Sequence, residues 1–381
     1  MQFIVKRIDN KNISNELELI GFDKSYVIEA SKKHSYMTLK IQNLPPYTAT
    51  IIKQTALSKG TDAGLHRDVL MHKKEVSDLI LSGTIKQLKE ISKSLSYQPF
   101  NLKEIALEID KEIELYYKKN EPEIMGILNL TEDSFSRDGI LDINTAIKKA
   151  ETLIIEGANI IDLGAESTRP NANKIDVEDE IKRLKPVVIE LKKSGYILSI
   201  DTRNHKTADI MLNSGADIIN DVSGLNYDKE MINVIKNYDK EIVIMHSKGT
   251  PENMDELCKY DNLADEIYNE LYKKIEFLNS KGIENKRIII DTGFGFAKNI
   301  EQNFELLKRI REFNSLNVRH LAGVSRKRFL QSLSDDKNNE EFDNITMLAS
   351  FYLIQNNVDI LRVHNVKKTK TAIEFYKKLT C

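Results

Sequence analysis

The sequence predicts an α/β protein in which a (β/α)8 barrel follows a smaller N-terminal domain. Three observations lead to this prediction. The chain has 381 residues, more than a single hydrophobic core usually organises. Eight short apolar runs alternate with helical patterns in its later part, as in a barrel of about 250 residues. Each run ends at a polar or charged residue, and the strand ends of such a barrel carry its active site.

A domain boundary is predicted near residue 120, in the polar stretch YKKNEP. A helical pattern over 102–116 ends there, because the residue before a proline disfavours helix. The first domain, 1–120, is expected to be a small α/β or α+β unit with a packing or oligomer-forming role, and the second is 121–381. In the first, strands are predicted over 2–7, 36–42 and 48–55, and further helices over 73–82 and 84–94.

The barrel strands are predicted from near-continuous apolar runs, because parallel strands under helices are buried on both faces. They cover 124–130, 159–165, 197–202, 217–223, 242–247, 287–292, 320–325 and 360–365. Helical spacing between them predicts helices over 145–156, 177–193, 206–214, 263–279 and 303–313. A doubly wound open sheet is the alternative. Against it, no GxGxxG turn follows the first strand, and polar residues end all eight strands.

Charge and cysteine content restrict the partners of the protein. A net charge of -2 gives no electrostatic reason to expect nucleic acid or an acidic membrane surface as a partner. Two cysteines, Cys258 and Cys381, are too few for a disulfide framework. The N-terminal apolar run is too short for a signal peptide or a membrane span. The expectation is therefore a cytoplasmic protein.

The polar strand ends, read together, indicate the chemistry of the ligand. Asp201, Asn220 and Asp291 follow apolar runs, and buried carboxylates and amides must be hydrogen-bonded. A nitrogen-rich heterocycle with an amidine edge would satisfy them. A single aspartate at a strand end is as often a cap, and His246 fits a core histidine better than a ligand-binding one. Side chains suited to phosphate or carboxylate follow other strands: Arg169, Arg326, Lys327, Arg362 and His364.

These segments together resemble the dihydropteroate synthase family of pterin-binding TIM barrels, from residue 124 almost to the C-terminus. The resemblance rests on eight motifs in order. They are MGILNLTEDSFS (125–136), GANIIDLGAESTRP (157–170), LSIDT (198–202), GADIINDVSGL (215–225), IVIMHSKGTPENM (242–254), IIIDTGFGFAKN (288–299), AGVSRKRFL (322–330) and LRVHNV (361–366).

The resemblance implies a reaction and the residues that perform it. In the family, 6-hydroxymethyl-7,8-dihydropterin diphosphate condenses with p-aminobenzoate to give 7,8-dihydropteroate and pyrophosphate, with Mg²⁺. Small-molecule substrates, a homodimer and sulfonamide binding are implied as well. The pterin would contact Asp201, Asn220, Met245, Asp291 and Lys327. The diphosphate would contact Asn129, Arg362 and His364, with Asn129 also binding Mg²⁺. The p-aminobenzoate would contact Thr168, Arg169, Pro170, Phe296, Ser325 and Arg326. The catalytic residues would be Asp201, Asp291, Lys327, Arg362 and His364.

The sequence also departs from the family pattern, and two other functions share the barrel. Ala165 and Ala297 replace glycines, Glu132 and Thr292 replace prolines, and Arg137 is inserted in the first loop. None of these changes removes a proposed catalytic group. A pterin-dependent methyltransferase would need neither a diphosphate pocket nor the Ser-Arg-Lys segment, so Ser325-Arg326-Lys327, Arg362 and His364 argue against it. Against a non-catalytic pterin-binding relative stand the intact residues Asn129, Asp201, Asp291, Lys327 and Arg362.

Overall fold

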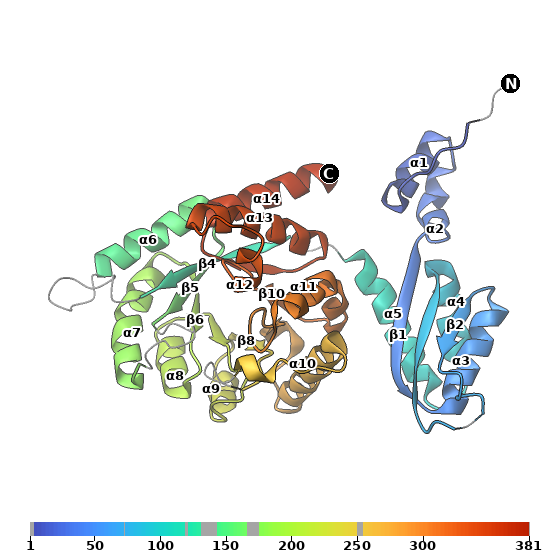
Figure 1. Cartoon of the computed structure of the whole chain (residues 1–381), viewed down its shortest axis with the longest axis horizontal. Coiled ribbons are helices and arrows are strands. Elements are labelled where there is room, and N and C mark those ends of the chain that lie inside the picture. The colour runs from blue at the N-terminus through green and yellow to red at the C-terminus, as the bar shows by residue number, and fades with distance from the viewer. Residues whose placement is uncertain are drawn as a thin grey trace. The chain divides into compact units, whose positions relative to one another are not determined.

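The computed structural model describes residues 4–71, 73–118, 121–130, 143–165, 175–249 and 254–380. The chain divides into two compact units, Met1–Lys118 and Lys119–Cys381. Figure 1 shows a small α/β unit and a barrel, and each has its own hydrophobic core. None of the helices in the described ranges combines the length and apolarity needed to cross a membrane.

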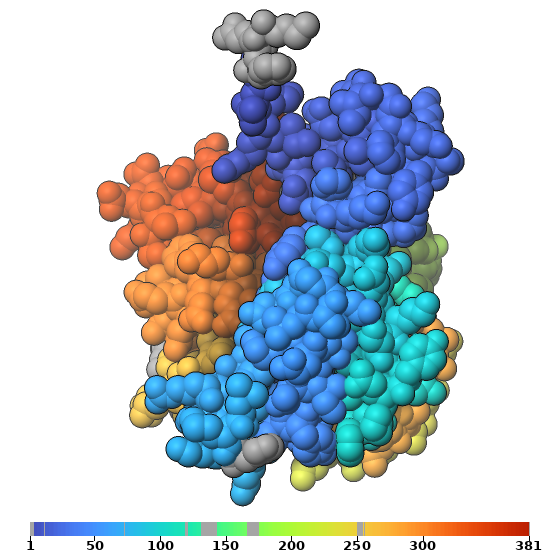
Figure 2. All heavy atoms as spheres, turned by 90° about the vertical axis from the view of Figure 1, so that its right-hand side faces the viewer, coloured from blue at the N-terminus to red at the C-terminus, as the bar shows by residue number. Residues whose placement is uncertain are grey.

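The first unit is a three-stranded antiparallel sheet with helices packed on its buried face. Its strands are β1 (Tyr36–Leu44), β2 (Asp62–Leu65) and β3 (Ser77–Thr84), in the order β1-β3-β2. Alternate side chains of β3, including Leu79 and Leu81, share one core with the helices α3 (Pro46–Ser58), α4 (Ile85–Leu95) and α5 (Leu102–Tyr117). Two short helices, α1 (Ile13–Leu19) and α2 (Val27–Ser31), lie at one end of this unit (Figure 2).

Within the first unit the sequence-based predictions were partly wrong. Residues 4–7 form no strand, and the strand predicted over 48–55 is part of helix α3. Pro46 begins that helix, and Ala49, Ile52 and Ala56 are buried at helical spacing. The helix predicted over 73–82 is replaced by strand β3, because its buried side chains alternate. The strand at 36–42 and the helices at 84–94 and 102–116 are confirmed.

The second unit is the predicted barrel of eight parallel strands, closed in the order β10-β11-β4-β5-β6-β7-β8-β9. Its strands are β4 (Glu123–Asn129), β5 (Ile160–Gly164), β6 (Ile197–Asp201), β7 (Ile218–Asp221), β8 (Glu241–Met245), β9 (Ile288–Asp291), β10 (Arg319–Ala322) and β11 (Ile360–Val363). The surrounding helices in Figure 1 are α6 (Ile143–Glu156), α7 (Val177–Lys193), α8 (His205–Asn213), α9 (Met231–Asn237), α10 (Leu263–Ser280), α11 (Ile300–Lys308), α12 (Arg328–Gln331), α13 (Asn339–Gln355) and α14 (Val366–Thr380).

One predicted barrel helix differs from the prediction. The helices over 145–156, 177–193, 206–214 and 263–279 are confirmed, but the pattern over 303–313 is divided between α11 and the 3-10 helix η6 (Ile310–Leu316). Ile310, Phe313 and Leu316 are all buried. They are three residues apart, and a 3-10 helix places such residues on one face.

The interior of the barrel has an apolar floor and a polar upper half. The floor is a cluster of inward side chains from seven strands: Met125, Ile160, Ile218, Val243, Ile289, Leu321 and Ile360. Successive inward positions of a strand are two residues apart. The next inward residues after four of these are polar, namely Asp162, Asn220, Asp291 and Arg362. A ligand of the barrel therefore meets polar groups above a closed apolar base.

Ion pairs between side chains also hold the base of the barrel together. Arg319 of β10 donates from Nη1 to Glu241 of β8 at 2.8 Å and from Nη2 to Glu123 of β4. Neither β4 nor β8 is next to β10 in the barrel. The arginine therefore ties together strands that share no backbone hydrogen bonds with its own. Groups at this end of such barrels serve stability.

Candidate active site

The barrel places the predicted pterin-binding side chains on neighbouring strand ends. Asp201 ends β6 and is in register with Asn220 of β7, while Asp291 ends β9 and is in register with Met245 of β8. All four are buried. Because parallel strands end on the same side of a barrel, these residues form one wall at its mouth.

Arg362 of β11 lies between two carboxylates in the barrel interior. Its Nε donates to Oδ2 of Asp162 at 2.7 Å, and its Nη2 donates to Oδ2 of Asp201 at 2.7 Å. The other oxygen of Asp162 accepts a hydrogen bond from Ser199 Oγ at 2.6 Å. The guanidinium is therefore fixed from both sides, by Asp162, which Ser199 supports, and by Asp201.

Burial and ion pairing shift the pKa values in this cluster. Burial raises the pKa of Asp201 to about 7, although Arg362 opposes the shift. Burial would lower the pKa of Arg362, but Asp162 and Asp201 outweigh it and raise that pKa above its ordinary value. Arg362 therefore stays positively charged beside the two carboxylates.

Two members of this cluster, Asp162 and Ser199, were not predicted from the sequence. Both are fully buried, and they are partners in register on β5 and β6. A signal was present, since a polar residue interrupts each of the apolar runs IIDLG and ILSID at an inward position. An isolated aspartate or serine within a strand is too common to assign alone. Only their contacts identify their role, since Asp162 accepts from Arg362 and Ser199 donates to Asp162.

Lys327 points at the turn that follows β9. Its Nζ donates to the carbonyl oxygen of Phe294 and lies 4.3 Å from the centre of the Phe296 ring. Burial lowers the pKa of Lys327 to about 8, with Asp291 opposing the shift. Burial raises the pKa of Asp291, with Lys327 opposing, and one oxygen of Asp291 accepts from the Gly293 amide at 2.7 Å. Lys327, Asp291 and Phe296 therefore belong to one site.

The turn after β9 requires special backbone conformations. Gly293 has φ of +69°, and a Cβ there would lie 2.0 Å from the His246 carbonyl oxygen, so no other residue fits. Ala297, which replaces a family glycine, adopts φ of 48°. An L-residue in this region carries strain of about 1–2 kcal/mol. The departure noted in the sequence thus falls on a left-handed position.

The buried side chain of Lys298 forms hydrogen bonds to the backbone of this turn. Lys298 donates from Nζ to the carbonyl oxygens of Gly293 at 2.9 Å and Phe296 at 3.0 Å, and it lies 3.0 Å from His246 Nδ1. Burial lowers the pKa of Lys298 to about 7 and lowers that of His246 far below its usual range. His246 is therefore the buried core histidine that was expected, and Lys298 supports the turn.

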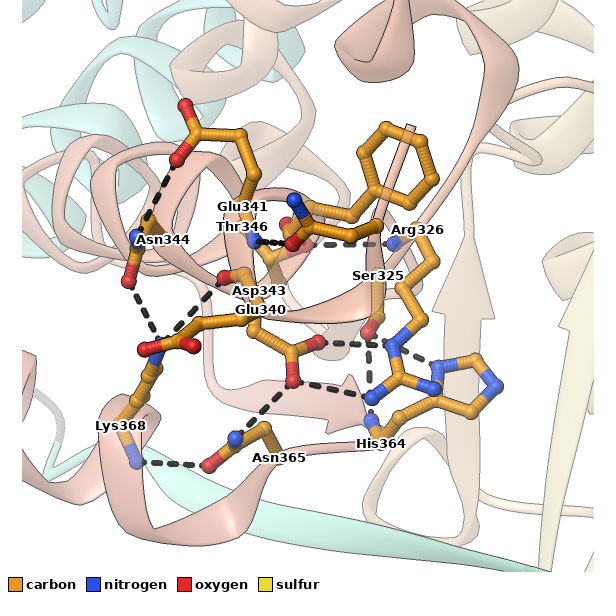
Figure 3. A network of polar contacts seen from close by, with 12 residues as sticks. Ser325, Arg326, Glu340, Glu341, Asp343, Asn344, Thr346, His364, Asn365 and Lys368 are labelled. Carbon is orange, nitrogen blue, oxygen red and sulfur yellow. Dashed lines mark hydrogen bonds and ion pairs between the residues drawn. The ribbon is translucent and has the colours of Figure 1, made fainter. Parts of the chain in front are cut away.

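Ser325 and His364 are in contact at the ends of β10 and β11. Ser325 Oγ lies 2.9 Å from His364 Nδ1 and accepts from the His364 amide at 3.2 Å. Arg326, the next residue, forms two hydrogen bonds with Asp343 of α13, as Figure 3 shows. The guanidinium of Arg326 is thus bound to the surrounding helix layer.

The remaining predicted residues are at the mouth or outside the described part of the chain. Asn129 is the last residue of β4 and its side chain is exposed. Thr168, Arg169 and Pro170 lie outside the described residues, as do Glu132 and Arg137. Among the described ranges, the structure brings together a wall of carboxylate and amide groups, a guanidinium and a Ser–His pair.

Comparisons with known proteins identify the class. A family model described as "Pterin binding enzyme" matches residues 125–364. Among solved structures, dihydropteroate synthase from Xanthomonas albilineans with 4-aminobenzoic acid is 32% identical, with a TM-score of 0.63 over 68% of this chain and 94% of that one. Dihydropteroate synthase from Clostridium difficile, solved with pteroic acid present, is 35% identical with a TM-score of 0.63, over 68% and 97% of the two chains. Fold and site thus define a pterin-binding barrel enzyme.

Curated relatives specify the family further. A Helicobacter pylori protein named bifunctional dihydropteroate synthase/dihydropteroate reductase is 34% identical over 99% of both chains. Dihydropteroate synthase of Streptococcus pyogenes is 38% identical over 67% of this chain and 95% of its own. The chain therefore belongs to the dihydropteroate synthase family. Its activity is the transferase reaction of folate biosynthesis that joins a pterin to p-aminobenzoate.

Proposed function

We propose that the barrel mouth performs this condensation with a carboxylate-and-amide wall for the pterin and a basic wall for the diphosphate. The observation that carries the proposal is that both walls meet at Arg362, which contacts Asp201 at 2.7 Å. The pterin is held by Asp201, Asn220, Met245, Asp291 and Lys327. The diphosphate is held by Asn129, Arg362 and His364. The p-aminobenzoate is held by Thr168, Arg169, Pro170, Phe296, Ser325 and Arg326.

The pterin ring matches the hydrogen-bonding groups of its wall. Asp291 uses one oxygen for the Gly293 amide, so its other oxygen accepts from the pterin amino group or ring N–H. Asn220 and Asp201 serve further ring nitrogens, and Lys327 donates to the ring carbonyl or a ring nitrogen. Burial makes each of these groups costly to leave unpaired, by about 1–3 kcal/mol. A ring that satisfies them is strongly preferred over one that does not.

Charge stabilisation accounts for the chemical step. The C–O bond to pyrophosphate breaks with its electron pair on the leaving oxygen, and the pterin methylene becomes positive. Asp201 and Asp291 are fixed nearby and stabilise this charge without reorganising. The amine nitrogen of p-aminobenzoate then attacks the methylene, and the proton that it loses passes to solvent. No covalent bond to the protein forms.

The family resemblance implies Mg²⁺, and the residue expected to bind it suits that ion. Asn129 is an exposed residue at the end of β4, and its side chain carries an amide oxygen. Mg²⁺ prefers oxygen ligands, keeps several waters and is often held by one or two side chains plus substrate phosphates. When bound, it would neutralise negative charge on the leaving pyrophosphate. Arg362 supplies positive charge and hydrogen bonds to the same group, and His364 supplies a further hydrogen bond.

The decisive assay is pyrophosphate release by the purified full chain, with pterin diphosphate and Mg²⁺, in the presence and absence of p-aminobenzoate. We expect release that depends on p-aminobenzoate and stops with a chelator. Product is identified as 7,8-dihydropteroate by mass. Absence of release in all mixtures would contradict the proposal and favour a non-catalytic pterin-binding protein. Methyl transfer from a methylated pterin would favour the methyltransferase alternative.

Arg362 offers a test of the diphosphate subsite. Replacing it by lysine keeps a positive charge for Asp162 and Asp201 but removes the planar fork that binds phosphate oxygens. We expect Arg362→Lys to weaken binding of the pterin diphosphate by roughly 10-fold. Binding of the hydroxymethylpterin without phosphates should change little. Both affinities are measured by titration calorimetry.

The matched control for Arg362→Lys is Arg311→Lys, an exposed arginine that follows α11. It should leave both affinities unchanged. Equal weakening of pterin and pterin diphosphate in Arg362→Lys would show that the residue acts on the ring and not on the diphosphate.

The full-length match to the Helicobacter pylori protein supports a second candidate activity. The relative is named for both a synthase and a reductase, and the match covers 99% of both chains, the first unit included. We propose that this chain also reduces its own product. A reduced nicotinamide or flavin would deliver hydride to C6 of dihydropteroate and a proton would reach N5, giving tetrahydropteroate.

The reductase proposal is tested by adding dihydropteroate and a reduced nicotinamide, with and without a flavin, to the full chain. Consumption of the nicotinamide that requires dihydropteroate supports it. Residues 121–381 alone, if they remain folded by circular dichroism, report whether the first unit is needed. No consumption by the full chain in any mixture would contradict this proposal and leave the synthase activity untouched.

We propose a homodimer, supported by exposed apolar side chains on the adjacent helices α13 and α14, namely Leu348, Tyr352, Phe375 and Leu379. Light scattering should give a dimer mass, and Leu348→Glu should reduce it. A monomer mass at micromolar concentration would contradict the proposal. We also propose a cytoplasmic location.

A further inference from the structure

Arg326 has a strained backbone at a functional position. Its φ is 54°, and an L-residue in this region loses about 1–2 kcal/mol relative to right-handed conformations. It stands between Ser325 and Lys327, which both have proposed roles at the substrates. Strain of this kind persists only where the surroundings fix the residue firmly. The contacts of Arg326 therefore decide how accurately its two neighbours are placed.

Helix α13 fixes Arg326 at both its side chain and its backbone. The guanidinium donates from Nε to Asp343 Oδ1 at 2.7 Å and from Nη2 to Oδ2 at 2.9 Å. The Arg326 amide donates to Thr346 Oγ1 at 3.2 Å. Its carbonyl oxygen accepts from Gln331 Nε2 at 2.7 Å. A paired fork of this kind restricts direction as well as distance.

The same carboxylate also reaches the turn after β11. Oδ2 of Asp343 accepts from Asn365 Nδ2 at 3.0 Å, and Asn365 Oδ1 accepts from the Lys368 amide at 3.0 Å. Asn365 directly follows His364, whose ring lies against Ser325. Figure 3 shows Asp343 between Arg326 and Asn365. One side chain of the outer helix layer thus connects two loops of the site.

Asp343 is charged and shielded in this position. It is 5% exposed. Burial alone would raise its pKa, but hydrogen bonds from Arg326 and Asn365 outweigh burial and lower the pKa of this carboxyl. Its two oxygens are engaged by three donors from two loops, so its contacts leave it no direct role at a substrate.

We infer that Asp343 is a positioning residue of the synthase reaction, acting through Arg326 and Asn365 to fix the loops that carry Ser325, Lys327 and His364. The inference rests on the proposed roles of those three residues. In this inference the guanidinium of Arg326 holds the loop, and only the backbone and the aliphatic part of the side chain contact the p-aminobenzoate. A site group displaced by 1 Å can lose roughly 100-fold in rate, even when the change lies far from the reacting atoms.

The test is a double-mutant cycle with Asp343→Asn and Arg326→Asn. Asparagine is chosen at 326 because it tolerates the left-handed conformation better than most residues. We expect each single change to lower kcat/KM for p-aminobenzoate by roughly 10- to 100-fold. The double variant should lose little more than the worse single one, because both changes remove one interaction. The control Glu340→Gln, one turn earlier on α13, should stay within about twofold.

Stability is followed separately for every variant. Assays are run well below the measured unfolding midpoint, so that a purely structural role of Asp343 would lower the midpoint and leave kcat and KM unchanged. That result would overturn the inference, as would additive losses in the double variant. If Asp343→Asn fails to fold, Asn365→Ser removes one support of the carboxylate. An expected loss of about 3-fold then supports the inference, and unchanged kinetics contradict it.

Ser325→Ala and Lys327→Met separate this inference from the proposed site. If both keep wild-type turnover, the roles assigned to the loop are wrong. If both lose turnover while the variants at 326 and 343 do not, the site assignment stands and the positioning role of Asp343 is wrong.

Discussion

Asp291→Asn is expected to lower kcat/KM for the pterin diphosphate by about 100-fold or more. The change keeps the shape of the side chain and removes its charge. One oxygen of Asp291 accepts from the Gly293 amide at 2.7 Å, so the new amide nitrogen would face pterin groups that are themselves donors. A positive methylene would also lose a fixed counter-charge. The measurement is steady-state pyrophosphate release with each substrate varied in turn.

Asp239→Asn provides the matched control, because that side chain is 95% exposed and lies just before β8 begins, at the end of the barrel opposite the mouth. It should behave as the wild type. Circular dichroism establishes that Asp291→Asn is folded. Turnover within about fivefold of the wild type would show that Asp291 does not bind the pterin, and the site would have to be reassigned.

Lys327→Met is expected to produce a loss of similar size, roughly 100-fold in kcat/KM. The partly buried ammonium lies 4.3 Å from the centre of the Phe296 ring and interacts electrostatically with Asp291, and methionine fills its volume without its charge or donors. A pH profile adds a second readout. Burial lowers the pKa of Lys327 to about 8. The group is charged below that pH and neutral above it, so wild-type kcat/KM should fall as the pH rises past about 8.

The fall in kcat/KM at alkaline pH should disappear in Lys327→Met. It should persist in the control Lys308→Met, which replaces an exposed lysine of α11. The pKa of Lys298 is also lowered, to about 7. If kcat/KM of Lys327→Met still falls at alkaline pH, the titrating group is therefore Lys298. Unchanged turnover in Lys327→Met would contradict the assigned role altogether.

Sequence patterns predicted an element correctly where burial on both faces permits only one kind of secondary structure. A strand covered on both sides must be apolar throughout, so eight such runs with polar ends predicted the barrel and the residues at its mouth. The first unit lacks this constraint. Its run over 48–55 has β-branched residues typical of strands, yet Pro46 and the spacing of Ala49, Ile52 and Ala56 make it a helix. The burial of one helical face therefore decided the structure of this segment against the strand preference of its β-branched residues.

The side-chain contacts within the site could not be predicted from the sequence. Arg362 and Asp162 are 200 residues apart in the chain, and only closure of the barrel through the pairing of β11 with β4 leaves a single strand between β11 and β5. Arg326 was predicted at the substrate because of its motif, but the motif cannot reveal Asp343 on a helix outside the barrel. Side chains on different elements become partners only when packing sets their distance.

The amino-acid sequence by itself determined the barrel, the order of its strands along the chain and the polar residues that end them, because each follows from local periodicity and burial. It also determined the family, because eight motifs occur in one order. Only the tertiary structure decided that Arg362 is bound by Asp162 and Asp201, that Lys298 supports the turn beneath Phe296, and that Asp343 connects two loops. Charge pairing depends on distances of about 3 Å between distant segments, and those distances exist only after folding.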